Sequence, residues 1–481
     1  MLDKIRNYLF TPVDIASLVF FRVCMGVIML VEVYRYFDHN WIKRFYMDPD
    51  FYFTYYGFGW VQPWPGDGMF WHFAALGVLA FMILVGAFYR IAAILFFIGF
   101  SYVFLLDQAR YLNHFYLVML ISFLMCFVPA NRALSVDAWL RPSIRADMIP
   151  RWGIALIVAQ FEIVLIYAGL VKINPDWLAL QPLTLWLAGD TALPLIGWLF
   201  AEKWALALGS YGVIVLHVIG APLLLWRKTR PYVFVLYLCF HLMNHTVFEI
   251  GIFPWMTIVG TLMFFPSDWP RRLWQRFALA LEGTIENMRG LRRGAIAAMT
   301  PDTVPQPVVA RMPGKGLQTV MVVGFVLWCA GQVLIPLRHY AYPSQVAWSE
   351  EGHRFAWRMK LRSKRGSARF VITETRSGQK WGVDLKEYLT RKQRRTMACR
   401  PDMILQFAHH LRDKMNAADV PDVKVTADIF CSLNGRTPKR LIDPDVDLAA
   451  EERTLASVDW ILPLDEPLPQ WPGPRRLARS N

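Results

Sequence analysis

The sequence lacks the cysteine patterns of a metal site or of a disulfide-rich secreted domain. Its six cysteines include no CxxC pair and no metal-ligand spacing. Four of them lie inside apolar runs: Cys24, Cys126, Cys239 and Cys329. In such runs a thiol behaves as a small hydrophobic group. Cys399 and Cys431 lie outside the runs and could pair if that part of the chain is extracytoplasmic. We expect no bound metal.

A nucleic-acid-binding signature is also missing, although the net charge is +14. No basic helix or RNA-binding motif accompanies this charge. The positive charge instead suits loops on the cytoplasmic membrane face and the binding of acidic peptides. We expect no nucleic acid as partner. The first apolar run lacks a small-residue cleavage site and is too long for a signal peptide, which predicts a retained helix.

What the sequence has in abundance is apolar and aromatic residues, 55% and 15% of the chain, far above a soluble domain. A membrane span needs about 17 to 25 mostly apolar residues. The sequence predicts an all-α transmembrane bundle of about nine helices, at residues 14–35, 70–88, 90–106, 114–129, 152–172, 205–226, 231–247, 250–266 and 317–336. Hydrophobic and polar residues then alternate at 357–361, 368–372 and 423–427, as in strands. We expect a helix at 401–415 and turns at Ser377-Gly378 and Asn434-Gly435.

Loop charges predict the orientation of these helices. Arginine and lysine should gather in alternate loops on the cytoplasmic side. They do so at Lys4, Arg6, Arg90, Arg132, Arg141, Arg145, Arg151, Arg227, Lys228, Arg230 and 271–315. An odd number of spans then places everything after residue 337 outside. The predicted organisation is a transmembrane part at 1–270, a basic amphipathic segment and proline-rich linker at 271–316, a last span at 317–336 and a β-rich extracytoplasmic domain at 337–481.

Lys172 is the most notable residue, because a long apolar helix ends at it and the polar stretch Asn174-Pro175-Asp176-Trp177 follows. Two interpretations are open. A lysine at a helix end commonly extends its amine to the lipid headgroups. Alternatively, an amine at the rim of an apolar pocket has a lowered pKa and acts as a base. The predicted orientation puts Lys172, Asn113-His114 and the soluble domain on one side, which favours a pocket there. The aromatic residues at 36–69 are expected to form an interfacial belt.

Motifs in both parts of the chain, taken in order, resemble the vitamin K-dependent γ-glutamyl carboxylases. In the membrane part they are 102–107 (YVFLLD), Asn113-His114, 130–132 (ANR), 135–137 (SVD), Gly169, Lys172, Asp176-Trp177, 241–244 (HLMN), Phe248, 250–253 (IGIF) and 269–271 (WPR). Later ones are 336–339 (PLRH), 402–403 (DM), 428–429 (DI) and 442–444 (IDP). Residues 1–270 then correspond to an HTTM-like catalytic membrane core, and the resemblance extends over nearly the whole chain.

The resemblance implies a reaction at the outer membrane face that uses reduced vitamin K, as phylloquinol or menaquinol, with O2 and CO2. A lysine deprotonates the hydroquinone, whose oxygenated form removes the γ-proton of a substrate glutamate. The carbanion takes up CO2, and the quinone leaves as its epoxide. Lys172 matches the catalytic lysine of the family, and Asn113 and His114 match its hydroquinone-binding pair, with His114 also taken as catalytic. The implied partners are the bilayer, an isoprenoid hydroquinone and a glutamate-containing peptide or protein.

The sequence departs from the vertebrate pattern at Val171, where that pattern has a second lysine. It also lacks a recognisable propeptide-binding surface, and we expect a bacterial inner-membrane protein with a periplasmic C-terminal domain. Arg338 and His339 could bind the substrate carboxylate or form a structural ion pair. Glu162 could be a proton relay or half of an ion pair. Alternative functions are quinol epoxidation without carboxylation, or non-enzymatic quinone binding or transport.

Overall fold

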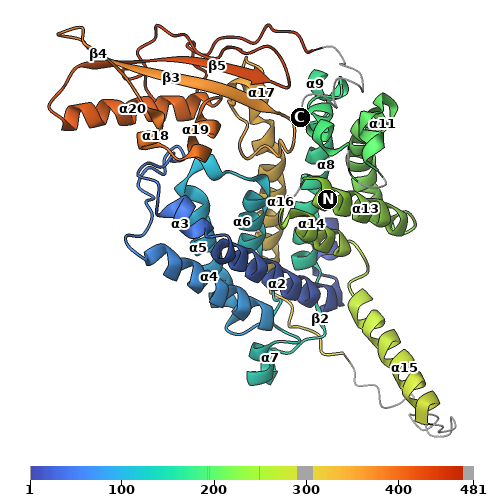
Figure 1. Cartoon of the computed structure of the whole chain (residues 1–481). Coiled ribbons are helices and arrows are strands. Elements are labelled where there is room, and N and C mark those ends of the chain that lie inside the picture. Colours follow the sequence, from blue (N-terminus) through green and yellow to red (C-terminus); the bar gives the residue numbers. More distant parts are fainter. Residues whose placement is uncertain (1, 192, 194–195, 249, 290–306, 470–481) are drawn as a thin grey trace.

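A computed structural model of the chain describes residues 2–191, 193, 196–248, 250–289 and 307–469. Part of the predicted linker, residues 290–306, lies outside the described residues. Figure 1 shows a bundle of helices with the strands β3 and β5 and helix α20 at one end. The bundle and this sheet-containing end correspond to the predicted membrane and soluble parts.

Seven helices in the described part of the chain are long and apolar enough to cross a membrane. They are α2 (Ala16–Asp38), α4 (Gly68–Val85), α5 (Tyr89–Leu106), α8 (Trp152–Leu170), the continuous helix Lys203–Leu225, α13 (Arg230–Phe248) and the helix Lys315–Ala341, which begins with α16 (Lys315–Leu337). The predicted spans at 114–129 and 250–266 are instead the shorter apolar helices α6 (Asn113–Met125) and α14 (Phe253–Leu262). At 1.5 Å per residue these are about 20 and 15 Å long, below the roughly 30 Å of a hydrocarbon core.

Short elements connect the spans. They are α1 (Leu2–Phe10), β1 (Pro12–Asp14), α3 (Trp41–Tyr46), η1 (Gln108–Arg110), α7 (Val136–Leu140), η2 (Pro142–Ile144), β2 (Met148–Pro150), α9 (Pro175–Leu178), α10 (Leu183–Leu187), η3 (Ala188–Asp190) and η4 (Gly197–Ala201). The strands β1 and β2 pair antiparallel, Pro12 opposite Pro150. This pairing ties the start of α2 to the start of α8.

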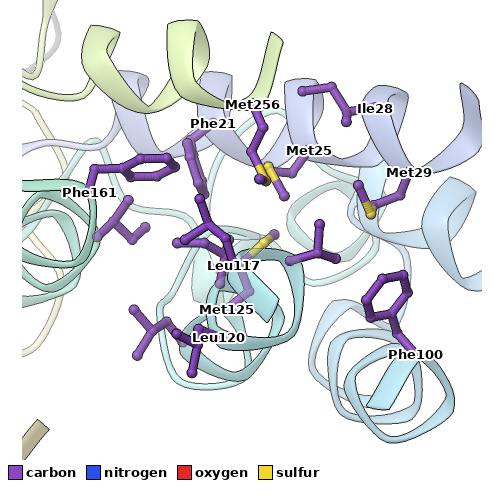
Figure 2. Packing of buried hydrophobic residues seen from close by; sticks show 14 of the residues in the cluster. Phe21, Met25, Ile28, Met29, Phe100, Leu117, Leu120, Met125, Phe161 and Met256 are labelled. Carbon is purple, nitrogen blue, oxygen red and sulfur yellow. The ribbon is translucent and has the colours of Figure 1, made fainter. Parts of the chain in front are cut away.

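The centre of the bundle is a continuous apolar core. Figure 2 shows Phe21, Met25 and Ile28 of α2 together with Leu117 and Met125 of α6. Methionine is unbranched and fills irregular gaps between helices that cross at different angles. Helices α2 and α4 approach closely at Gly26, where a Cβ would lie 2.7 Å from the backbone of Leu84. No larger residue fits at that position.

The C-terminal part contains one antiparallel sheet in the order β4-β3-β5-β6. Its strands are β3 (Lys364–Glu374), β4 (Lys380–Gly382), β5 (Val423–Leu433) and β6 (Lys439–Arg440), and its helices are α17 (Val346–Ser349), α18 (Leu385–Tyr388), α19 (Arg391–Met397) and α20 (Pro401–Ala417). Alternate residues of β5 are buried, so one face of this strand is covered, and Phe370 of β3 packs against Phe407 of α20. The predicted helix, the strands at 368–372 and 423–427 and both turns are confirmed. Only two strands are long, so "β-rich" overstated the sheet.

The predicted strand at 357–361 is wrong. This stretch belongs to a loop, and Trp357 and Lys360 within it have positive φ, as does Phe355 just before it. Trp357 and Leu361 are buried in the core of the helical bundle rather than in the domain that follows. The alternation of residue types reflects a chain that enters the bundle and leaves it again, so tertiary packing overrides the strand pattern.

The two parts of the chain are joined by several contacts. Phe53 is buried in the core of the C-terminal domain, and Tyr55 is buried in the bundle core against Phe355, so these aromatics do not form the predicted interfacial belt. Trp60, by contrast, is exposed. Cys399 and Cys431 form a disulfide that links the α19–α20 junction to β5. The pairing that the sequence left open is therefore present.

Helix α15 (Trp269–Arg289) forms where an amphipathic segment was predicted. Figure 1 shows it projecting from the end of the bundle opposite to the sheet. The large exposed apolar side chains in its first part, residues 269–280, are Leu273, Trp274, Phe277 and Leu279. Exposed apolar groups of this size on a helix with nearby arginines are typical of a helix that lies on a membrane surface.

Candidate active site

Lys172 lies in the turn between α8 and α9. Pro175 cannot continue α8, and the residue before it, Asn174, has an extended backbone. The Asn174 side chain accepts a hydrogen bond from the Trp177 backbone N–H at 3.1 Å and so caps α9. Trp177 in turn donates through its indole N–H to the Ser210 carbonyl at 3.0 Å. The local sequence thus stops the helix just beyond Leu170 and leaves Lys172 at its end.

The Lys172 amine is buried, with 6% of the residue exposed. Its Nζ donates to the Ala168 carbonyl at 2.7 Å and lies 5.1 Å from the centre of the Trp177 ring. Among the described residues no carboxylate pairs with it. Lys172 lies beyond the span Trp152–Leu170, and desolvation lowers its pKa to about 7. A snorkelling lysine would keep its amine in water, so the burial favours the interpretation as a base.

Lys172 lines a cavity of about 430 Å³. Most of its wall is apolar and comes from α8, α10, α13 and the helix Lys203–Leu225, with Phe253 of α14 and Met359 of the C-terminal part. The polar side chains in the wall are Lys172, His217, His241, Asn244 and Lys360. The cavity therefore combines a large apolar volume with a few nitrogen groups, as small-molecule sites do.

Two histidines of this cavity were missed as site residues by the sequence analysis. His217 and His241 are 3% and 1% exposed. His217 donates through Nδ1 to the Val213 carbonyl at 2.9 Å. Neither ring nitrogen of His241 has a hydrogen-bond partner in the described protein. The available signal was that each is a polar residue within an apolar span, and such residues mark functional sites in membranes.

A local distortion places His217. It lies in a π-helical segment, Leu216–Gly220, between α11 (Lys203–Val215) and α12 (Ala221–Leu225). Pro222 has no N–H for the Val218 carbonyl, which accounts for the irregular turn. Gly169 of α8 faces this segment, and a Cβ there would lie 2.8 Å from His217 Cβ. The glycine thus lets α8 approach His217 closely just before Lys172.

Asn113 and His114 begin α6 and do not line the cavity. His114 packs at 6.2 Å from the ring of Phe253, which does line it. Asn113 accepts a hydrogen bond from the Tyr111 hydroxyl at 3.0 Å and donates to the Arg358 carbonyl at 3.5 Å. The predicted pair therefore lies outside the cavity: His114 is next to Phe253 of the cavity wall, and Asn113 contacts the loop that supplies Met359 and Lys360.

Arg338 and His339 also lie away from this cavity. Arg338 donates to the Arg354 carbonyl and lies 5.7 Å from the Phe355 ring. It lines a second cavity of about 480 Å³, between the bundle and the C-terminal domain, together with Arg354, Arg400 and Asp402. His339 is buried, with Nδ1 2.7 Å from the Pro336 carbonyl. Among the described residues neither forms an ion pair with a carboxylate.

Glu162 lies within α8, and neither of its carboxyl oxygens has a hydrogen-bond partner in the part of the chain that is described. The ion pair considered for it is therefore absent there. No group of three histidine, cysteine, aspartate or glutamate side chains among the described residues could hold a metal. The nitrogen groups of the first cavity are the ones that could hold an organic cofactor.

Comparison with known protein families identifies the family of this chain. Residues 10–269 match the HTTM domain, and residues 317–467 match the lumenal domain of vitamin K-dependent gamma-carboxylase. No solved structure matches the chain. The HTTM match covers more than half of the 481 residues and contains Lys172, His217 and His241. Together with its apolar helices, these matches show that the chain is an integral membrane protein that belongs to the vitamin K-dependent gamma-carboxylase family.

Proposed function

We propose that this protein is a quinol-dependent γ-glutamyl carboxylase that couples epoxidation of reduced vitamin K to carboxylation of glutamate side chains. The observation that carries the proposal is the buried Lys172 amine, which has no carboxylate partner and lines an apolar cavity. Membership of the family implies the use of reduced vitamin K, O2 and CO2. The particular reaction is our inference from the site.

The cavity fits the ring system of a vitamin K hydroquinone. Its volume of about 430 Å³ lies within the range of small-molecule sites. Apolar walls suit a lipid-soluble ring, and the unpartnered ring nitrogens of His241 are polar groups that a ligand hydroxyl would satisfy. When bound, a reduced vitamin K supplies the reducing power and the strong base that the removal of a glutamate γ-proton requires.

The chain's own residues would prepare this chemistry. Lys172 is the base for the hydroquinone hydroxyl: a phenol has a pKa of about 10, and a neutral amine can accept its proton. One N–H of that amine is held by the Ala168 carbonyl, which leaves its lone pair for the substrate. His217 and His241 would hydrogen-bond to quinol oxygens, and the apolar walls would exclude water. We retain Asn113 and His114 as residues that support the Phe253 side of the site.

The direct test is incubation of purified protein with reduced vitamin K, labelled CO2 and a glutamate peptide, with epoxide and incorporated label measured separately. We expect both products, and a glutamine peptide should take up no label. Epoxide without label would favour the alternative of quinol epoxidation alone. Absence of both products, under conditions in which the protein is folded and binds the quinol, would refute the proposal.

We further propose that the C-terminal domain lies on the periplasmic side of a bacterial inner membrane. The loop charges, the disulfide between Cys399 and Cys431 and the position of α15 at the opposite end support this orientation. A Lys386→Cys variant should react with a membrane-impermeant thiol reagent in intact spheroplasts, because Lys386 is exposed on α18. Labelling that occurs only after the membrane is opened would reverse the orientation. The unmodified protein is the control for reaction at the native cysteines.

A further inference from the structure

Lys360 brings a second amine into the cavity of Lys172. It comes from the C-terminal part of the chain, in the loop between α17 and β3, whereas Lys172 comes from the membrane bundle. Its backbone has φ +50°, and Phe355 and Trp357 in the same loop also have positive φ. Such conformations are unfavourable for non-glycine residues and persist where surrounding contacts hold them, often at functional sites. The loop is held by Trp357 and Leu361, which are buried in the bundle core.

Lys360 is an exposed residue, and its amine lies among aromatic rings. Its Nζ lies 4.7 Å from the centre of the Phe248 ring and 5.1 Å from that of Trp186, and both rings line the cavity. Aromatic faces attract a cation but do not neutralise its charge. No carboxylate among the described residues pairs with Lys360, and no acidic side chain lines this cavity. The cavity thus contains a positioned ammonium group without a counter-ion.

We propose that Lys360 binds the side-chain carboxylate of the substrate glutamate inside the cavity. This inference rests on the proposed function and names the residue that holds the second substrate. A carboxylate is the chemical complement of an unpaired ammonium group, and the hydrogen bond between them is charge-assisted. The same contact would stabilise the negative charge that grows on the carboxylate when the neighbouring C–H loses its proton. Lys172 then acts on the quinol, and Lys360 positions the glutamate.

The structure favours Lys360 over Arg338 for this role. Arg338 lines the second cavity, and its guanidinium already donates to the Arg354 carbonyl. The loop that carries Lys360 also supplies Arg354 and Phe355 to that second cavity. A carboxylate bound at Arg338 would be in a different cavity from Lys172, whereas one bound at Lys360 would be in the same cavity.

The test measures binding and turnover separately. Binding of a short glutamate peptide and of the same peptide with glutamine is measured by calorimetry on the detergent-solubilised full chain, without quinol. We expect Lys360→Met to weaken binding of the glutamate peptide by about tenfold to 100-fold and to leave the glutamine peptide unaffected. Lys360→Arg should restore most of the preference. Lys386→Met, which changes an exposed lysine that lines neither of the two cavities described above, is the matched control.

The kinetic readout is the KM for each substrate. Lys360→Met should raise the KM for the glutamate peptide and change the KM for the quinol by less than about twofold. If Lys360→Met does not fold, Lys360→Gln is used in its place. Equal binding of both peptides by the unmodified protein, or unchanged preference in the Lys360 variant, would overturn the inference. Lys360-dependent binding without any epoxide formation would instead refute the proposed function and leave this carboxylate site intact.

Discussion

Replacing Lys172 by methionine should lower quinol epoxidation by about 10²–10⁴-fold, the usual contribution of a positioned general base. Methionine has a similar length and fills the same apolar position, so the fold should persist. The reason for the loss is specific. Among the described residues Lys172 is the only amine of this cavity that belongs to the membrane bundle. The preceding residue is Val171, which packs in the apolar core, so no adjacent lysine can replace it. The measurement is epoxide formation under saturating quinol.

The pH dependence separates this role from a structural one. Because the pKa of Lys172 is lowered to about 7, the fraction of neutral amine rises with pH and is nearly complete above pH 8. The rate should therefore rise about tenfold per pH unit below 7 and level off above it. Lys172→Arg keeps a cation but stays protonated, so it should be as inactive as the methionine variant. A rate independent of pH between 5.5 and 7.5, or an active Lys172→Arg variant, would remove Lys172 as the base.

Replacing Arg436 by methionine should destabilise the protein by about 3–5 kcal/mol, the cost of leaving one member of a buried ion pair without its partner. Arg436 lies just after β5 and makes two 2.7 Å contacts with the carboxylate of Asp176 in α9. The two side chains are only 8% and 4% exposed. Asn434 donates to the same carboxylate at 2.7 Å. The measurement is thermal unfolding of the purified protein in detergent.

This pair also connects the C-terminal domain to the site. Asp176 is followed by Trp177, whose ring lies against the Lys172 amine. We therefore expect Arg436→Met to lower turnover beyond the effect on stability. The matched control is Arg440→Met, which removes a 49% and 41% exposed pair with Asp428 and should cost less than about 1 kcal/mol. Adding Asp176→Asn to Arg436→Met should recover part of the stability. Equal effects of the two arginine variants would show that the buried pair is unimportant.

The two amines of the cavity illustrate how the site is assembled. Lys172 belongs to the bundle, and Lys360 is 188 positions later in the C-terminal part. The loop of Lys360 reaches the bundle because Trp357 and Leu361 are buried among its helices. Separate expression of the membrane part would therefore lack part of the cavity wall, so experiments on the site need the full chain.

The sequence alone determined the membrane class, the positions of the long helices and the helix predicted at 401–415, which ends two residues later in the structure. It also singled out Lys172 as a candidate site residue. These follow from local properties: apolar runs, proline and asparagine at helix ends, and alternation along strands, all of which depend on neighbouring residues. The family resemblance added Asn113 and His114. It could not indicate that neither residue lines the cavity, because that depends on how α6 and α14 pack.

Only the tertiary structure decided which polar residues share the cavity. His217, His241 and Lys360 lie on three different segments and come together because α8 packs on the π-helical segment at Gly169 and the 350–362 loop enters the bundle. The same long-range packing turned a strand-like pattern at 357–361 into a loop with positive φ. Contacts between residues far apart in the chain leave no periodic signal in one sequence, because each partner taken alone is an ordinary histidine or lysine.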